Sequence, residues 1–217
     1  MSEDDQAATI VSTVIRARRS TRHFAGAIPP TEDMSEILQS AILAPFGGAT
    51  GIPLKEIRKI FVFSQGTQSM DRARELLMAQ LRRNSRKISV VLFCFPFLRK
   101  KMLPFSRRIG ALAQEGIPGL REAAYYVIIA ERKGFPPVEK QSITHAMQNM
   151  WLSATARGLG FELIFATGIM SKNRDFMQFL GLNVGDYVVD GCVIGVPKTA
   201  PVSRVEYRTE DFVTWVQ

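Results

Sequence analysis

The most informative stretch of the chain covers residues 146–160 and reads AMQNMWLSATARGLG. Its apolar residues recur at the spacing of a helix, which aligns Met147, Met150, Trp151 and Ala154 along one side. Gly158 or Gly160 is a suitable end for this helix, because glycine accepts the backbone conformation that closes a C-terminus. We therefore expect a long helix that starts near Ser142 and turns its apolar side into the core.

The segments on either side predict a small sheet and further helices. Apolar runs predict buried strands at 60–63, 123–130, 161–166 and 187–196, with a polar turn at 131–134 after the second strand. Helices are expected at 6–17, with Val11, Val14 and Ile15 on one face, and at 69–81 and 174–180. Helices outnumber strands and alternate with them irregularly, which indicates an α+β fold, or mixed α/β sandwich, in a single domain over 1–217.

The clearest short helix follows Pro29 and Pro30. Thr31 is expected to be its N-cap, with Glu32 and Asp33 in the first turn. The helix ends before Pro45, and its apolar stripe consists of Met34, Ile37, Leu38, Ala41 and Ile42.

The composition is that of a globular protein, with 46% apolar and 22% charged residues among 217. No apolar run approaches the ~20 residues that a helix needs to cross a bilayer. Residues 1–8 are acidic and polar, unlike a signal peptide, so we expect a cytoplasmic protein. Cys94 and Cys192 lie in apolar runs and are expected to be buried thiols. His23 and His145 are far apart in sequence, and no metal site is expected.

The net charge of +8 belongs to one segment, residues 76–114. That segment contains no Asp or Glu, and the other 19 of the 28 basic residues are balanced by the 20 acidic ones. Its nine basic residues are Arg82, Arg83, Arg86, Lys87, Arg99, Lys100, Lys101, Arg107 and Arg108. They bracket a nearly continuous apolar run at 88–98.

Several separated stretches, in the right order, resemble the nitroreductase family. Residues 18–24, RRSTRHF, resemble its N-terminal signature, and residues 41–48, AILAPFGG, resemble a helix end and loop that usually reads APSGGN. Residues 146–160 resemble the family's central dimer helix. Residues 180–182, 193–198 and 208–215 are similar to its late strand and tail.

The resemblance implies a nitroreductase-like fold, with a central, mostly antiparallel sheet of four to five strands flanked by helices, and a homodimer that binds FMN. The FMN phosphate and ribityl chain would be held by Arg18, Arg19, Ser20 and Arg22, with Arg208 as the matching tail arginine. Forked guanidinium groups and a hydroxyl suit a phosphate, because they give paired, charge-assisted hydrogen bonds. The alternative is that this basic turn is solvated surface charge.

The resemblance places the flavin ring against two further segments. One is Pro45, Phe46, Gly47 and Gly48, whose backbone would approach the ring across the dimer interface. The other is Thr167 and Gly168, expected just after the strand at 161–166, where a backbone N–H would face the flavin N5 or carbonyl edge. The usual Asn after Gly-Gly is Ala49 here, and Gly51-Ile52-Pro53-Leu54 replaces the usual Gln-Pro-Trp, so a side-chain hydrogen bond to the flavin is lost.

The implied activity is an oxidoreductase that passes reducing equivalents in two steps from NADH or NADPH, through FMN, to a small planar electron-poor acceptor such as a nitroaromatic or quinone. No catalytic side chain is expected, since the flavin performs the chemistry. Because of the departures at 49 and 51–54, the alternative is a protein that binds flavin or another planar ligand without turnover.

The segment 76–114 falls where family members differ most, and three roles stay open for it. It could be a lid over the flavin cleft that packs on the partner subunit. It could be an interfacial anchor on an anionic membrane surface, since apolar residues here are flanked by clustered Lys and Arg. It could also dock an acidic electron-transfer protein at 82–108. Nucleic-acid binding is not expected, because the aromatic residues lie in the apolar run and not among the charges.

Overall fold

In the computed structural model, which describes residues 2–46, 51–200 and 207–216, the core is built on strand β2 (Tyr125–Arg132). Its alternate side chains are buried on both faces of a sheet. Tyr126 and Ile128 join one apolar cluster, and Val127 and Ile129 join the other. A strand that is apolar on both faces must be covered by other elements on both sides, and the helices supply that cover.

The sheet is antiparallel throughout and has the strand order β1-β2-β4-β3. Strand β1 (Arg58–Ser64) pairs with β2, and β2 pairs with β4 (Tyr187–Gly195). Strand β3 (Gly160–Leu163) forms the other edge beside β4. The α+β fold and the antiparallel sheet of four strands confirm the prediction from the sequence.

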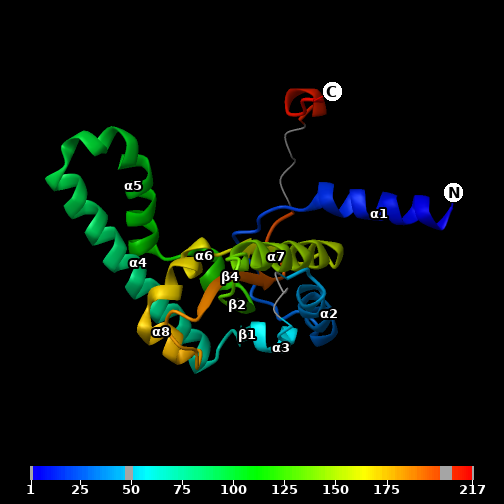
Figure 1. The fold of residues 1–217 in the computed structure, drawn as a ribbon, viewed down its shortest axis with the longest axis horizontal. Coiled ribbons are helices and arrows are strands. Elements are labelled where there is room, and N and C mark those ends of the chain that lie inside the picture. Colours follow the sequence, from blue (N-terminus) through cyan, green and yellow to red (C-terminus); the bar gives the residue numbers. More distant parts are fainter. Residues whose placement is uncertain (1, 47–50, 201–206, 217) are drawn as a thin grey trace.

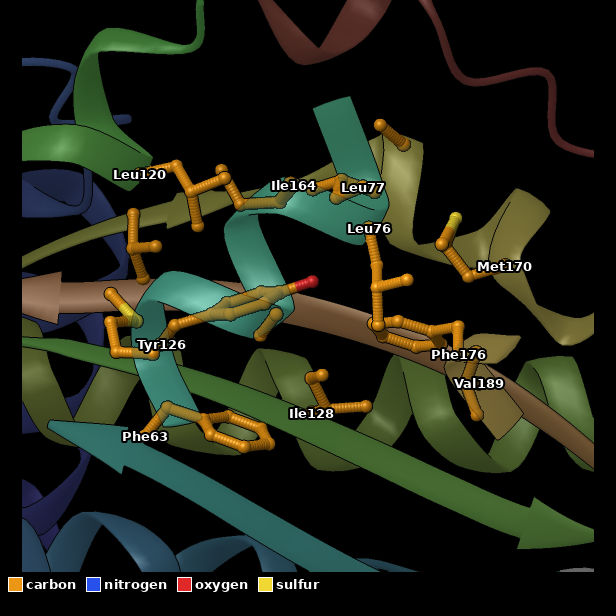
Figure 2. Packing of buried hydrophobic residues seen from close by; sticks show 14 of the residues in the cluster. Phe63, Leu76, Leu77, Leu120, Tyr126, Ile128, Ile164, Met170, Phe176 and Val189 are labelled. Atoms are coloured by element: carbon orange, nitrogen blue, oxygen red, sulfur yellow. The ribbon is translucent and has the colours of Figure 1, made fainter. Parts of the chain in front are cut away.

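Two helical layers enclose the sheet (Figure 1). Helices α2 (Thr31–Ile42) and α7 (Glu139–Ala156) cover one face, where Ile37 and Met150 are fully buried. The other face is covered by the first half of α4 (Gln68–Cys94), the 3-10 segment η2 (Phe165–Lys172) and α8 (Arg174–Phe179). Figure 2 shows this second layer, with Leu77 and Phe176 packed toward Tyr126 and Ile128.

Other elements lie outside these layers. Helix α1 (Glu3–Ala17) has no buried residue, and Ser2 and Asp5 form its capping box. The short helices are α3 (Leu54–Ile57), η1 (Pro96–Leu98), α6 (Pro118–Glu122) and η3 (Thr209–Asp211). Helix α5 (Arg99–Glu115) runs back along α4, and together they form a helical hairpin that stands out from the body (Figure 1).

The predicted helices and strands lie at the expected positions in the chain, but several of them begin or end at other residues than predicted. Pro30, not Thr31, is the N-cap of α2, so the threonine begins the helix without a side-chain cap. The strand expected over 161–166 ends at Leu163, and Ala166 and Thr167 belong to η2. The helix expected at 69–81 continues to Cys94, because no Gly or Pro interrupts residues 82–94 and helix α5 (Arg99–Glu115) packs along this part.

Two expectations about buried polar and sulfur groups are also corrected. Residues 131 and 132 continue β2 and are not a turn, and the Glu131 side chain is only 2% exposed because Arg58 pairs with it. Cys192 is buried as expected, but Cys94 is exposed because it lies at the tip of the hairpin.

Candidate functional site

The basic turn at 18–24 crosses the end of strand β3. Ser20 forms a β-bridge with Phe161, and the Thr21 N–H donates to the Phe161 carbonyl oxygen at 3.0 Å. This crossing is close: a Cβ added at Gly160 would lie 2.6 Å from Thr21 Cγ2. Glycine at 160 therefore allows the turn to pass tightly over the strand, which fixes the position of Ser20.

Trp151 of α7 ties the turn to the central helix. The guanidinium carbon of Arg18 lies 4.1 Å from the centroid of the indole ring, and the indole Nε1 donates to the Arg19 carbonyl oxygen at 3.1 Å. The same ring stacks on Phe161, with centroids 5.1 Å apart. One buried aromatic residue thus holds the basic turn by a cation–π contact and a backbone hydrogen bond.

A cavity of about 360 Å³ opens beside this turn. Ser20 and Arg22 lie at its wall, together with Arg108 of α5. The other lining residues are Leu112, Ile117, Pro118, Trp151, Glu162, Leu163, Ile164 and Phe165. Ser20 and two arginines thus border a space with a largely apolar wall, an arrangement that suits a ligand with one anionic end and one flat apolar end.

Glu162 is the acidic residue of this cavity. Its Oε1 lies 3.9 Å from Arg22 Nε, while its buried Oε2 has no hydrogen-bond partner among the described residues. Burial raises the pKa of this carboxyl, and the nearby Arg22 and His23 lower it in part. The carboxylate of Glu122, by contrast, accepts the Phe24 N–H at 3.1 Å, and this bond holds the pKa of Glu122 below its usual range.

Gly168 lines a second cavity, of about 350 Å³, that shares Phe165 with the first. The sequence predicted that Gly168 follows directly after a strand, but it lies within the 3-10 segment η2. A Cβ added at Gly168 would meet nothing closer than the Val189 carbonyl oxygen at 3.9 Å. Asp190 also lines this cavity, and burial raises the pKa of its carboxyl.

The side chain of Thr167 faces the core and not a cavity. Its hydroxyl lies 2.7 Å from the Tyr126 hydroxyl, and Thr167 is fully buried. Burial raises the pKa of Tyr126 well above its usual range, so both hydroxyls stay neutral. With no exposed surface in the single chain, Thr167 lines neither cavity.

Pro45 and Phe46 lie elsewhere, after the C-terminal end of α2. A buried network holds this end: Arg58 Nη1 donates to the Ala41 carbonyl oxygen, and Arg58 Nη2 donates to Ser142 Oγ at 3.1 Å. Glu131 Oε1 lies 2.5 Å from Arg58 Nη2 and also accepts from Ser142 Oγ at 3.0 Å. Arg58 and Ser142 both reach the Pro45 carbonyl oxygen at 3.4 Å, so this network anchors the start of the loop.

Of the expected site residues, Ser20, Arg22 and Gly168 line the two cavities. Gly47 and Gly48, with Ala49, lie outside the described residues. Arg208 lies on the exposed C-terminal segment, which stands apart from the sheet in Figure 1, and its Nε is 3.3 Å from Glu210 Oε2.

A model of the nitroreductase family matches residues 15–196 of the chain. The chain belongs to the nitroreductase family. The matched range contains the basic turn, both cavities and the Arg58 network, and it also contains the hairpin. No curated protein sequence matches the chain.

Solved nitroreductase-like structures share the fold at low identity. A nitroreductase with bound FMN from Bacteroides fragilis NCTC 9343 is 19% identical, with a TM-score of 0.69 over 95% of this chain and 98% of that chain. A nitroreductase with bound FMN from Desulfitobacterium hafniense DCB-2 is 20% identical, with a TM-score of 0.68 over 96% and 98%. Iodotyrosine deiodinase bound to FMN and 3-iodo-L-tyrosine is 15% identical, with a TM-score of 0.66 over 95% and 99%.

Several residues of this nitroreductase-family site were missed in the sequence. Arg108 carried only a charge-run signal, and Glu162 carried none. Trp151 was expected to face the core, but not to hold the basic turn. Within the ranges that the structure describes, no three His, Cys, Asp or Glu side chains are grouped to hold a metal ion, and no helix is long and apolar enough to cross a membrane.

Proposed function

We propose that this protein is an FMN-dependent oxidoreductase that takes reducing equivalents from NADH or NADPH and passes them to a small planar electron-poor acceptor. The observation that carries the proposal is the convergence of Ser20, Arg22 and Arg108 on one cavity that shares the lining residue Phe165 with the Gly168 cavity. The first cavity offers donors for a phosphate, and the second offers a backbone segment for a flat ring.

The residues present fit FMN in their donor chemistry. Ser20, Arg22 and Arg108 would hold the phosphate and the polar chain, with Arg18 and Arg19 beside them in the same turn. Trp151 and Phe165 supply apolar wall. When bound, FMN supplies the two-electron redox chemistry, while this chain supplies binding, orientation and the electrostatic field.

We infer that the working form is a homodimer, in which Pro45, Phe46, Gly47, Gly48 and Arg208 complete the site of a second copy. Helix α1 supports this, because Ile10 and Val11 are more than half exposed in the single chain and no residue of α1 is buried. Apolar surface of this kind is favourably covered by association.

The first test of the proposal is flavin binding. We expect the purified chain to show a visible flavin spectrum, or to take up added FMN more tightly than riboflavin, since riboflavin lacks the phosphate. Arg22→Ala should weaken FMN binding by roughly tenfold to a hundredfold, because a hydrogen bond to a charged group contributes about 1.5–3 kcal/mol. Arg72→Ala is the matched control, because Arg72 is exposed and pairs with Glu75 away from the cavity. Equal affinity for FMN and riboflavin would contradict the phosphate site.

The second test separates an enzyme from a carrier. The departures at Ala49 and at 51–54 favour, as second candidate, a flavin-binding protein without turnover. We expect anaerobic NADH or NADPH to bleach the bound flavin, and a nitroaromatic or quinone to restore its colour. A flavin that stays oxidised with both nucleotides contradicts hydride transfer and supports the carrier.

A further inference from the structure

The α4–α5 hairpin leaves the body of the protein after Leu81. Helix α4 is buried along its first half, where Leu77 and Leu81 join the core, and then Leu92 is its one further buried residue. Beyond Leu81 the two helices pack on each other, as a Cβ added at Gly110 would lie 3.9 Å from Ser85 Oγ. Arg99 Nε donates to the Leu92 carbonyl oxygen at 3.1 Å and closes the turn.

The outer part of this hairpin, residues 82–108, is called the hairpin tip here, and its surface is unusually apolar. Phe93 and Phe97 are each 77% exposed, on either side of the turn. The other exposed large apolar residues of the tip are Val90, Val91, Phe95, Leu103 and Phe105. Four exposed phenylalanines on one projecting hairpin tip form a surface that water solvates poorly.

The same tip carries all nine basic residues of the segment and no acidic residue. Arg108, at its inner end, lines the Ser20 cavity, and the other eight are left for contact with a partner surface. Within the part of the chain that the structure describes, no ion pair joins any of the nine to a carboxylate. Lys87 lies just before the exposed apolar turn, and Arg99, Lys100 and Lys101 lie just after it. The charges therefore flank the apolar surface from both helices.

We propose that the hairpin tip docks on the surface of an anionic lipid bilayer. Exposed phenylalanines bracketed by lysine and arginine match a membrane interface, where apolar side chains enter the boundary of the acyl chains and cations meet anionic headgroups. A second copy of the tip is a poor occupant, because it would bring nine positive charges against nine without an acidic residue between them. An acidic protein would satisfy the charges, but it has no need of four exposed phenylalanines.

Vesicle flotation with the full-length chain tests this docking. We expect the chain to float with vesicles of mixed phosphatidylcholine and phosphatidylglycerol, not with phosphatidylcholine alone, and to be released by high salt. Phe93→Ser/Phe97→Ser should lower the partition coefficient by at least about tenfold, because it removes the apolar part of the contact. Lys100→Gln/Lys101→Gln should lower it by roughly thirtyfold, since each basic residue near an anionic surface contributes about a factor of five.

Matched controls lie outside the tip. Phe135→Ser removes a phenylalanine that is 91% exposed near the end of β2, and Lys55→Gln/Lys133→Gln removes two exposed lysines. Both controls should bind vesicles like the natural chain. The four substituted tip residues are exposed, so we expect the tip variants to have the same thermal unfolding temperature as the natural chain. A loss of vesicle binding is then not a loss of folding. Failure of the natural chain to float with anionic vesicles overturns the proposal. Unchanged vesicle binding by both tip variants also overturns it. If the chain binds an acidic protein but no vesicles, the partner is a protein and not a membrane.

Discussion

The indole Nε1 of Trp151 donates a hydrogen bond to the carbonyl oxygen of Arg19 at 3.1 Å. This bond joins the middle of the central helix to the basic turn more than a hundred residues earlier in the chain. It places the turn beside the cavity without using any of the arginine side chains. The guanidinium of Arg18 rests on the same ring, so Trp151 orders the turn from two directions.

Trp151→Phe should therefore loosen the basic turn while keeping the core packed. Phenylalanine retains an apolar ring against Phe161 but has no N–H, which leaves the Arg19 carbonyl without this donor. We expect a loss of about 1 kcal/mol in the free energy of unfolding. We also expect a several-fold weaker FMN affinity, measured by fluorescence titration. Trp215→Phe is the control, because Trp215 is 87% exposed and should change neither quantity. Unchanged FMN affinity in the Trp151 variant would contradict the positioning role.

The buried pair Arg58 and Glu131 predicts a non-additive double substitution. Each side chain is only 2% exposed, so Arg58→Met leaves a buried carboxylate without its partner. We expect this single change to cost about 3–5 kcal/mol in the free energy of unfolding. Arg58→Met/Glu131→Leu should cost less than Arg58→Met alone, since no charge is then left unpaired. Urea unfolding measures both, and a double variant less stable than the single one would show that the pair matters only through packing and the loop contacts of Arg58.

Much of the fold could be predicted from the apolar spacing of the chain. The periodicity of 146–160 indicated the central helix and its buried side, and the apolar runs indicated four strands. The end of β3 could not be found in this way, because the apolar residues 163–166 run from the strand into η2 without a change in hydropathy. Glu131 was expected in a turn because its partner Arg58 is 73 residues away, and only the paired strands bring them together.

The candidate site was predictable only in part. Ser20 and Arg22 carry phosphate-binding chemistry in a short segment, and they line the cavity together. In the sequence, nothing distinguishes Arg108 from the other eight basic residues of the segment 76–114. The packing of α5 against α4 brings Arg108 to the cavity. The exposure of Cys94 has the same origin, since the helical hairpin turns its apolar tip outward.

Glu162 predicts a specific dependence of stability on pH. Its folded-state pKa is raised by burial above the unfolded value of about 4.3. Such a group stabilises the fold fully below the unfolded pKa, and this contribution is lost as the pH rises through the higher folded pKa. Glu162→Gln removes the titrating group, so at neutral pH we expect the variant to be more stable than the natural chain, with the difference shrinking below about pH 4. Glu210→Gln, at an exposed position, is the control, and denaturant unfolding at several pH values supplies the measurement. A stability difference that does not vary with pH would contradict the burial of the ionised form.

At Gly168, an effect on ligand binding can be measured apart from an effect on the stability of the fold. A Cβ at this position would lie 3.9 Å from the nearest protein atom, the Val189 carbonyl oxygen, and the backbone is not in the left-handed region. Gly168→Ala should therefore change the free energy of unfolding by less than about 1 kcal/mol. The added methyl would enter the cavity lined by Phe165 and Asp190, so FMN binding and the anaerobic reduction of bound flavin should both weaken. Gly191→Ala is the opposite case, since its Cβ would lie 2.7 Å from Thr167 Oγ1, and we expect it to destabilise the core. If Gly168→Ala binds FMN like the natural chain and its bound flavin is reduced in the same way, the flavin ring does not lie against this segment. Neither the fold nor the ligand then requires glycine at this position.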